Sequence, residues 1–218
     1  MITDYHCHCL PQMDDGSRSV EMSVQMLKKL QLQNVNKVMA TPHYYPHKED
    51  VASFLNRREV SYNALLQAIA DDANLPEVEL GAEVYLCKGL SRENLSGLCT
   101  ESGTILLELP FSSFKSWMLD EIENITYQFS VVPVIAHIER YLPFYHKEDF
   151  ERLFSFEEAV WQINNSAFSH LKTKLFVQKL LHQGYQVVLG SDAHNLSNRA
   201  PNFDQVQKYL KKYPQING

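Results

Sequence analysis

The chain has 218 residues, 44% of them hydrophobic, and carries a net charge of −6. This length suits one globular domain, residues 1–218, at a size where a single α/β barrel can form. The acidic balance argues against nucleic acid as a partner, because phosphate backbones are bound by clustered Lys and Arg. The sequence has no apolar run of about 18 residues and no signal-peptide pattern, so we expect a cytoplasmic protein without membrane insertion.

Short apolar runs rich in β-branched residues recur along the chain and predict strands. They cover residues 2–7, 35–41, 78–84, 104–109, 131–136, 159–163 and 186–189. The segments between them have helical apolar spacing, as in Val20, Val24, Leu27 and Leu30. Strands that alternate with helices predict parallel βαβ units, and seven such units without a linker favour a closed or nearly closed barrel.

Side chains of the kinds that bind metals or phosphate stand at the ends of six of these runs. In barrels of this kind the reactive residues lie at the carboxyl ends of the strands, so we expect these side chains to converge. In chain order they are His6 and His8, His43, Glu83, Glu108, His137 with Arg140, and Asp192 with His194. The sixth run, which ends near Asn164 and Asn165, has no obvious ligand.

Nine imidazole and carboxylate groups are candidate metal ligands, which is too many for one ion and predicts a multinuclear centre. They are His6, His8, Asp15, His43, Glu83, Glu108, His137, Asp192 and His194. Nitrogen and hard oxygen donors suit manganese, iron or zinc better than a cysteine-rich structural zinc site. Cys7 and Cys9 alternate with His6 and His8, so we expect both thiols to face away from the ligands.

These motifs together resemble the polymerase and histidinol phosphatase (PHP) superfamily, and most closely its bacterial CpsB-type tyrosine-protein phosphatase branch. That branch is found with capsule and exopolysaccharide genes. The resemblance runs in order along essentially the whole chain. Its motifs are His6-Cys-His8, Leu-Pro-Gln-Met-Asp-Asp15-Gly, Thr-Pro-His43, Gly-Ala-Glu83, Glu108-Leu-Pro, His137-Ile-Glu-Arg140-Tyr and Ser-Asp192-Ala-His194-Asn.

The resemblance implies a distorted (β/α)7 TIM-like barrel, the PHP fold, with three metal ions that are usually manganese. The first ion would be held by His6, His8, Glu83 and Asp192. Glu83 would bridge to a second ion, held also by Glu108 and His137. The third ion would be held by Asp15, His43 and His194.

The resemblance also implies a reaction and a partner. A water activated by the metal would hydrolyse phosphotyrosine, and the substrate would be the phosphotyrosine tail of a bacterial tyrosine kinase. Arg140 and Arg199 match the arginines of the family that contact phosphate. A planar guanidinium suits this task because it can grip two phosphate oxygens at once.

Two other functions remain open. One is a PHP-type phosphoesterase that acts on histidinol phosphate or nucleic-acid ends, and the other is a non-catalytic barrel that keeps its metal as a structural element. The complete ligand set and the two arginines favour the phosphatase. A cysteine-based phosphatase would need an Arg shortly after its thiolate, but the corresponding positions after Cys7 and Cys9 hold Met13 and Asp15.

Aromatic residues follow the second and fifth predicted strands, where they form a candidate wall for an aryl phosphate. They are Tyr44, Tyr45, Tyr141 and Phe144, with loop packing as the alternative interpretation. The remaining histidines are predicted to be surface or helix-end residues rather than ligands. They are His47, His146, His170 and His182.

Overall fold

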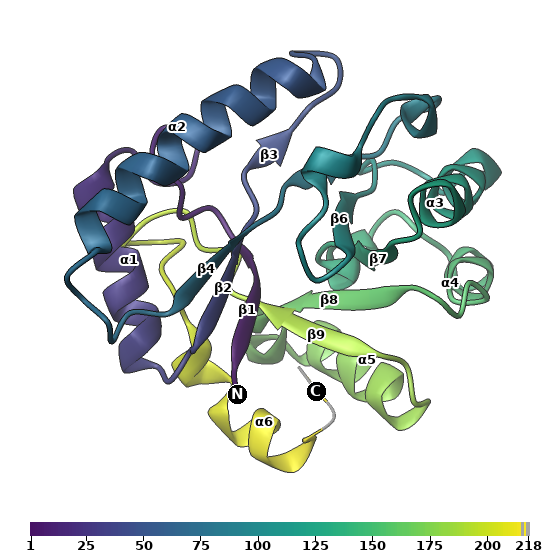
Figure 1. The fold of residues 1–218 in the computed structure, drawn as a ribbon. Helices are drawn as coiled ribbons and strands as arrows, with labels where there is room; N and C mark the ends of the chain where they lie inside the picture. Colours follow the sequence, from purple (N-terminus) through teal and green to yellow (C-terminus); the bar gives the residue numbers. More distant parts are fainter. Residues whose placement is uncertain (215, 217–218) are drawn as a thin grey trace.

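A computed structural model describes residues 1–214 and 216, and it places parallel strands at the centre with helices around them (Figure 1). The strands are β1 (Thr3–Cys7), β2 (Lys37–Ala40), β3 (His43–Tyr44), β4 (Glu77–Leu80), β5 (Glu83–Tyr85), β6 (Thr104–Glu108), β7 (Val132–Ile135), β8 (Val160–Asn164) and β9 (Val187–Gly190). The α-helices are α1 (Val20–Leu32), α2 (Val51–Ile69), α3 (Ser116–Phe129), α4 (Lys147–Leu153), α5 (Leu171–His182) and α6 (Gln207–Lys212). Short 3-10 helices are η1 (Leu90–Arg92), η2 (Ser96–Leu98), η3 (Ile138–Tyr141), η4 (Asn165–Ser169) and η5 (Phe203–Gln205).

The strands form two parallel sheets that meet at the first and last strands of the chain. One sheet has the order β1-β2-β4, and the other has the order β3-β5-β6-β7-β8-β9. Cys7 at the end of β1 forms a parallel bridge with Ala193, just after β9. The His8 N–H donates to the Ala193 carbonyl at 2.9 Å. Every predicted strand run overlaps an observed strand, which confirms the parallel α/β fold.

One predicted strand is interrupted, so the prediction of a continuous strand over 78–84 is wrong. The run over 35–41 holds β2, which ends at Ala40, and the short strand β3 begins beyond this run, after Pro42, which has no N–H for a sheet ladder. The run over 78–84 is broken at Gly81 and Ala82, and the Gly81 carbonyl accepts a hydrogen bond of 2.7 Å from Arg58 on α2. Beyond these points, β3 and β5 pair in the second sheet with His43 opposite Glu83.

The helices bury the apolar faces that their spacing predicts. Ser19 caps α1 by accepting a hydrogen bond from the Met22 N–H, and Leu27 and Leu30 of this helix are fully buried. On β1, Cys7 belongs to the hydrophobic core while its neighbours along the strand turn to the opposite face. Among the described residues, no helix is long and apolar enough to cross a membrane.

A polar cluster fastens β2 and β4 to the loop that precedes β6. The Glu79 carboxylate accepts hydrogen bonds from the Ser102 N–H at 2.8 Å and from its hydroxyl at 3.0 Å. Lys37 lies 2.6 Å from the other carboxylate oxygen. Although burial alone raises the pKa of Glu79, the contacts with Lys37 and Ser102 lower it below its ordinary value.

Replacing Glu79 with Gln is expected to lower the free energy of unfolding by about 1 to 2 kcal/mol at pH 7, because a charged acceptor is lost. The pKa of Glu79 is lower in the folded protein than in the unfolded chain, where it is about 4.3. The stabilisation by ionised Glu79 is therefore fully present above the unfolded pKa, and it is lost as the pH falls through the folded pKa. Urea unfolding of both proteins at neutral and acidic pH measures this. A difference that stays constant down to about pH 3.5 would contradict the assignment.

Candidate metal centre

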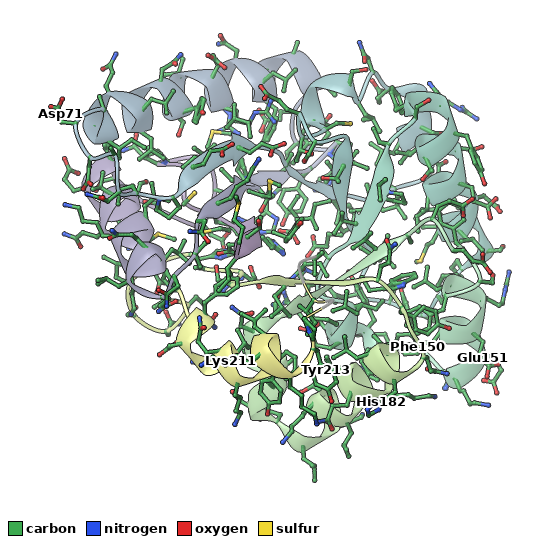
Figure 2. All side chains as sticks on the ribbon, turned by 60° about the horizontal axis from the view of Figure 1, so that its bottom comes forward. Asp71, Phe150, Glu151, His182, Lys211 and Tyr213 are labelled. Atoms are coloured by element: carbon green, nitrogen blue, oxygen red, sulfur yellow. The ribbon has the colours of Figure 1, made fainter. Side chains whose placement is uncertain are left out.

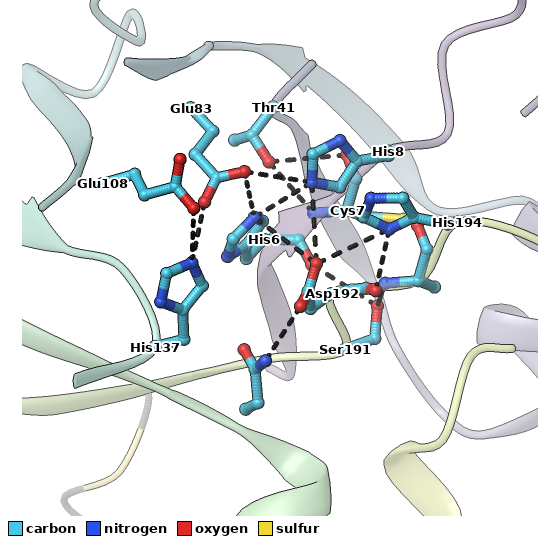
Figure 3. Close-up of polar contacts among 12 residues, drawn as sticks. His6, Cys7, His8, Thr41, Glu83, Glu108, His137, Ser191, Asp192 and His194 are labelled. Carbon is cyan, nitrogen blue, oxygen red and sulfur yellow. Dashed lines mark hydrogen bonds and ion pairs between the residues drawn. The ribbon is translucent and has the colours of Figure 1, made fainter. Parts of the chain in front are cut away.

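Side chains from the end of β1, from the start of β5 and from the turn after β9 meet at one buried point (Figure 3). His6 Nε2 and His8 Nε2 lie 3.1 Å apart, and they lie 3.1 and 3.3 Å from the same oxygen of Glu83, Oε2. Asp192 Oδ1 is 3.8 Å from His6 Nε2 and 3.6 Å from His8 Nε2. These four residues are the ones that the family resemblance assigns to the first ion.

The second oxygen of Glu83 faces a different group of side chains. Glu83 Oε1 lies 2.9 Å from His137 Nε2, which in turn lies 3.5 Å from Glu108 Oε1. A carboxylate whose two oxygens face two clusters has the geometry of a bridging ligand. The assignment of Glu83 as a bridge remains a prediction that this geometry supports.

A third group of donors lies on the solvent side of the first. Asp15 Oδ1 is 3.4 Å from His194 Nε2 and 3.6 Å from His43 Nε2. His43 also places Nδ1 2.9 Å from Glu83 Oε2, so this residue lies between the first and third groups. All nine predicted ligands are therefore brought together, and distance alone places several of them in more than one group, among them Glu83, His43 and His194.

Three of the histidines have Nδ1 engaged by an oxygen acceptor. His8 Nδ1 contacts Asp14 Oδ2 at 2.7 Å. His6 Nδ1 contacts Gln162 Oε1 at 3.0 Å, and His194 Nδ1 contacts a main-chain carbonyl at 3.0 Å. Because these oxygens accept, each Nδ1 carries a proton, and Nε2 of the neutral imidazole presents its lone pair.

This arrangement fits divalent cations. Two lone pairs 3.1 Å apart, beside a buried carboxylate, repel one another unless positive charge lies among them. The Nε2 atom of His194 is buried and has no hydrogen-bond partner in the described part of the chain. The donor set of imidazoles and carboxylates is one that transition metals accept.

The electrostatic field of the site also favours positive charge. Burial alone lowers the pKa of His8, but the carboxylates of Asp14 and Glu83 raise it well above its ordinary value. Burial also tends to lower the pKa of His137, but Glu108 and Glu83 raise it to about 9. Burial tends to raise the pKa of Glu83, yet the surrounding histidines hold it well below the usual range.

Two of the predicted ligands stand in strained backbone conformations. His137 has a φ of 33° and Asp192 a φ of 51°, both in the left-handed region that non-glycine residues rarely adopt. The His137 N–H donates to Gln162 Oε1 at 2.7 Å, and the Asp192 N–H donates to the His6 carbonyl at 2.8 Å. These bonds hold the sharp turns that follow β7 and β9.

Strand β8, for which the sequence shows no ligand, supplies the hydrogen bonds behind the ligands. Gln162 accepts from both His6 and His137 through Oε1, and its amide donates to Asn164 at 3.0 Å. Asn164 donates to Asp192 Oδ2 at 2.9 Å. This role was not predicted from the sequence, although the two amides at alternate positions of an apolar strand were a signal for it.

Asp14 was not among the residues predicted for the site, although the adjacent Asp15 was. Asp14 is nearly buried, with 7% of its side chain exposed, whereas Asp15 is 67% exposed. The Asp14 carboxylate accepts from His8, from the His43 N–H at 2.8 Å and from the Gly16 N–H at 2.8 Å. A Cβ at Gly16 would lie 2.5 Å from the His8 Cβ, so only glycine fits this turn.

The two predicted phosphate clamps lie at the edge of the centre. Arg199 Nη2 is 2.7 Å from Asp192 Oδ1, and Arg199 Nη1 is 3.7 Å from Asp15 Oδ2. Arg140 Nη1 is 3.6 Å from the other oxygen of Asp192. Both guanidiniums are partly exposed, so they contact the ligand cluster and also solvent.

The structure agrees with the exclusion of a cysteine nucleophile. Cys7 is fully buried, and a hydrogen bond with Cys9 together with burial raises the pKa of its thiol well above the ordinary value. A thiol in this state is not the thiolate that nucleophilic catalysis requires.

The predicted aromatic wall is wrong for two of its four members. Tyr44 and Tyr141 are buried, because their rings pack into the core, and the Tyr141 hydroxyl bonds both backbone groups of Leu109. Tyr45 stacks on His43 with 5.1 Å between ring centroids. Phe144 is partly exposed and lies in a pocket beyond Arg140.

The fold and the site define a class: a parallel α/β protein with a candidate multinuclear metal centre at the carboxyl ends of its strands. The chain belongs to the CpsB/CapC family of capsular polysaccharide synthesis, whose model matches residues 2–215.

Its relatives include the tyrosine-protein phosphatase CpsB of Streptococcus pneumoniae, which is 28% identical over 231 residues that cover 96% of this chain and 90% of that protein. The tyrosine-protein phosphatase YwqE of Bacillus subtilis is 27% identical over 225 residues, covering 96% and 84% respectively.

Solved structures show the same fold. A structure from work on YwqE of Bacillus subtilis and CpsB of Streptococcus pneumoniae, described as unique metal-dependent tyrosine phosphatases, superimposes with a TM-score of 0.79 at 23% identity. The match covers 97% of this chain and 87% of that chain. A histidinol phosphatase homologue from Listeria monocytogenes gives a TM-score of 0.51 at 14% identity, covering 97% and 99%.

Replacing Asp14 with Asn is expected to weaken Mn²⁺ binding by about 10- to 100-fold, because His8 loses the charged acceptor that orients it and fixes its proton on Nδ1. Isothermal titration of the metal-stripped protein with Mn²⁺ measures the effect. Asp71→Asn is the control, since this exposed residue lies at the edge of the molecule beyond the end of α2 (Figure 2). Equal affinities for both folded variants would refute the role of Asp14.

Proposed function

We propose that this protein is a metal-dependent protein-tyrosine phosphatase of capsular or exopolysaccharide synthesis. The observation that carries the proposal is the convergence of nine imidazole and carboxylate side chains on one buried region, with Arg140 and Arg199 at its edge. Membership of the CpsB/CapC family supports it, as do relatives that are named tyrosine-protein phosphatases and match over most of their length.

The proposal assigns the nine residues to three ions, as the resemblance implies, and takes manganese as the metal. Iron or zinc would suit the same donors. The proposal treats residues 1–218 as one domain with a distorted seven-stranded (β/α) barrel. The number seven results from counting β2 and β3 as one broken strand, and β4 and β5 as another. Gln162 and Asp14 orient His6 and His8 for metal binding.

Bound divalent ions would lower the pKa of a bound water and offset the charge of the phosphate. Three such ions bring about +6, and four carboxylates bring about −4, which leaves a surplus near +2 that a phosphate monoester dianion matches. The four are Asp15, Glu83, Glu108 and Asp192. Arg140 and Arg199 would each grip phosphate oxygens and orient the ester for attack.

An aryl phosphate is the easier ester for such a site, because a phenol leaves at a pKa near 10 and makes little demand on a general acid. The proposed substrate is the phosphotyrosine tail of a bacterial tyrosine kinase. Phosphorylation by a kinase that consumes ATP takes place in the cytoplasm, so the proposal places the protein there.

Removal of metal by EDTA should abolish hydrolysis of p-nitrophenyl phosphate and of a phosphotyrosine peptide, and Mn²⁺ should restore it, because the nucleophile depends on bound metal. Initial rates for the stripped and reloaded protein measure this. Full activity after rigorous stripping would refute the mechanism. A panel with phosphoserine peptide and histidinol phosphate tests the substrate: a preference for histidinol phosphate would favour the PHP-type phosphoesterase instead.

Replacing Arg140 with Lys is expected to lower kcat/KM for a phosphotyrosine peptide by about 10- to 100-fold, since an ammonium group cannot grip two oxygens at once. Mn²⁺ affinity should stay unchanged, because Arg140 is not among the proposed ligands. Arg152→Lys, at an exposed position on α4, is the control. An unchanged kcat/KM in Arg140→Lys would remove this residue from the phosphate site.

A further inference from the structure

A pocket with a volume of about 520 Å³ lies next to the candidate metal centre. The loops that follow β6, β7 and β8, together with the start of α5, line it. Its lining includes Phe111, Arg140, Phe144, Ala167, His170 and Lys172. Because the three loops follow the carboxyl ends of strands, this pocket opens on the same end of the fold as the metal centre.

Phe111 and Arg140 join the pocket to the centre. The Phe111 ring stacks on His137, a proposed metal ligand, with 5.6 Å between centroids and an angle of 21° between the planes. The Arg140 guanidinium lies 4.8 Å from the centre of the same ring. A phosphate held by Arg140 would therefore lie beside the mouth of this pocket.

The lining suits a large apolar side chain with acidic neighbours. Phe111 and Phe144, 5.9 Å apart between centroids, each keep 38% of their surface exposed, which is unusual for rings beside a buried cluster. Arg140 and the exposed Lys172 bring positive charge to the lining, whereas Glu139, its one carboxylic acid, is buried. Pockets of about 300 to 1,000 Å³ with apolar walls and a few polar groups are typical of binding sites.

We propose that this pocket binds a large apolar side chain of the phosphoprotein substrate, within about three residues of the phosphotyrosine, with acidic residues beside it that face Lys172. The spacing follows from an extended chain, which advances about 3.3 Å per residue. This inference rests on the proposed function and adds a preference for the sequence around the phosphotyrosine. A small aryl phosphate has no group that reaches the pocket.

The test uses the Mn²⁺-loaded protein and phosphotyrosine peptides with alanine flanks, in which a single Phe is placed in turn at each of about three positions on either side. For the wild type, one position should raise kcat/KM by about tenfold over the all-alanine peptide, a factor that corresponds to 1.4 kcal/mol. Phe144→Ala should reduce that ratio to about threefold or less. Comparing ratios within one variant cancels any effect of the substitution on the reaction itself.

Two further variants make the result specific. Leu175→Ala removes a side chain that is 55% exposed on α5 but lies outside the pocket lining, so the wild-type ratio should persist. The wild type should prefer peptides in which Asp flanks the apolar side chain. Lys172→Glu should prefer peptides with Lys at that position instead, since the substitution reverses the charge of the side chain that faces it.

The outcomes separate this inference from the function on which it rests. If the wild type hydrolyses all phosphotyrosine peptides with equal kcat/KM, the pocket proposal is wrong and the phosphatase assignment stands. The same holds if Phe144→Ala keeps the full wild-type ratio. If the loaded wild type hydrolyses no phosphotyrosine peptide, the proposed function fails and the inference fails with it.

Discussion

The buried carboxylate of Glu83 is the group on which the rest of this site depends. An ionised carboxylate away from water is costly unless charges of opposite sign and hydrogen-bond donors surround it. Imidazoles from β1, from the start of β3 and from the turn after β7 all lie within 3.3 Å of its two oxygens. The strand break before Glu83 and the left-handed turn at His137 are both part of this arrangement.

A layer of hydrogen bonds behind the ligands determines which nitrogen His6 and His8 present. Asp14 and Gln162 occupy the Nδ1 atoms of His8 and His6, and Asn164 holds one oxygen of Asp192. Such partners orient ligands and fix their tautomers, and their loss typically lowers metal affinity by about 10- to 100-fold. Strand β8 thus contributes to the centre without providing a proposed ligand.

An acidic protein can act on the anionic substrate of the proposed reaction, because the charge at the metal centre differs from the charge of the chain as a whole. Over the whole chain, 26 Asp and Glu residues exceed 20 Lys and Arg residues. At the centre, several carboxylates are already engaged with histidines, and two arginines stand at the edge. Divalent ions added there would reverse the local sign while the outer surface stays negative, which disfavours nucleic acid.

Periodicity and strand ends in the sequence determined the parallel α/β fold, and the ordered motifs were enough to identify the nine candidate ligands and the two arginines. These features are local, since apolar spacing and short motifs can be recognised within a few consecutive residues. Only the tertiary structure separated buried Asp14 from exposed Asp15, broke the predicted strand over 78–84, and brought Gln162 to His6, 156 positions away. Such hydrogen bonds depend on how distant strands lie side by side, which local patterns do not encode.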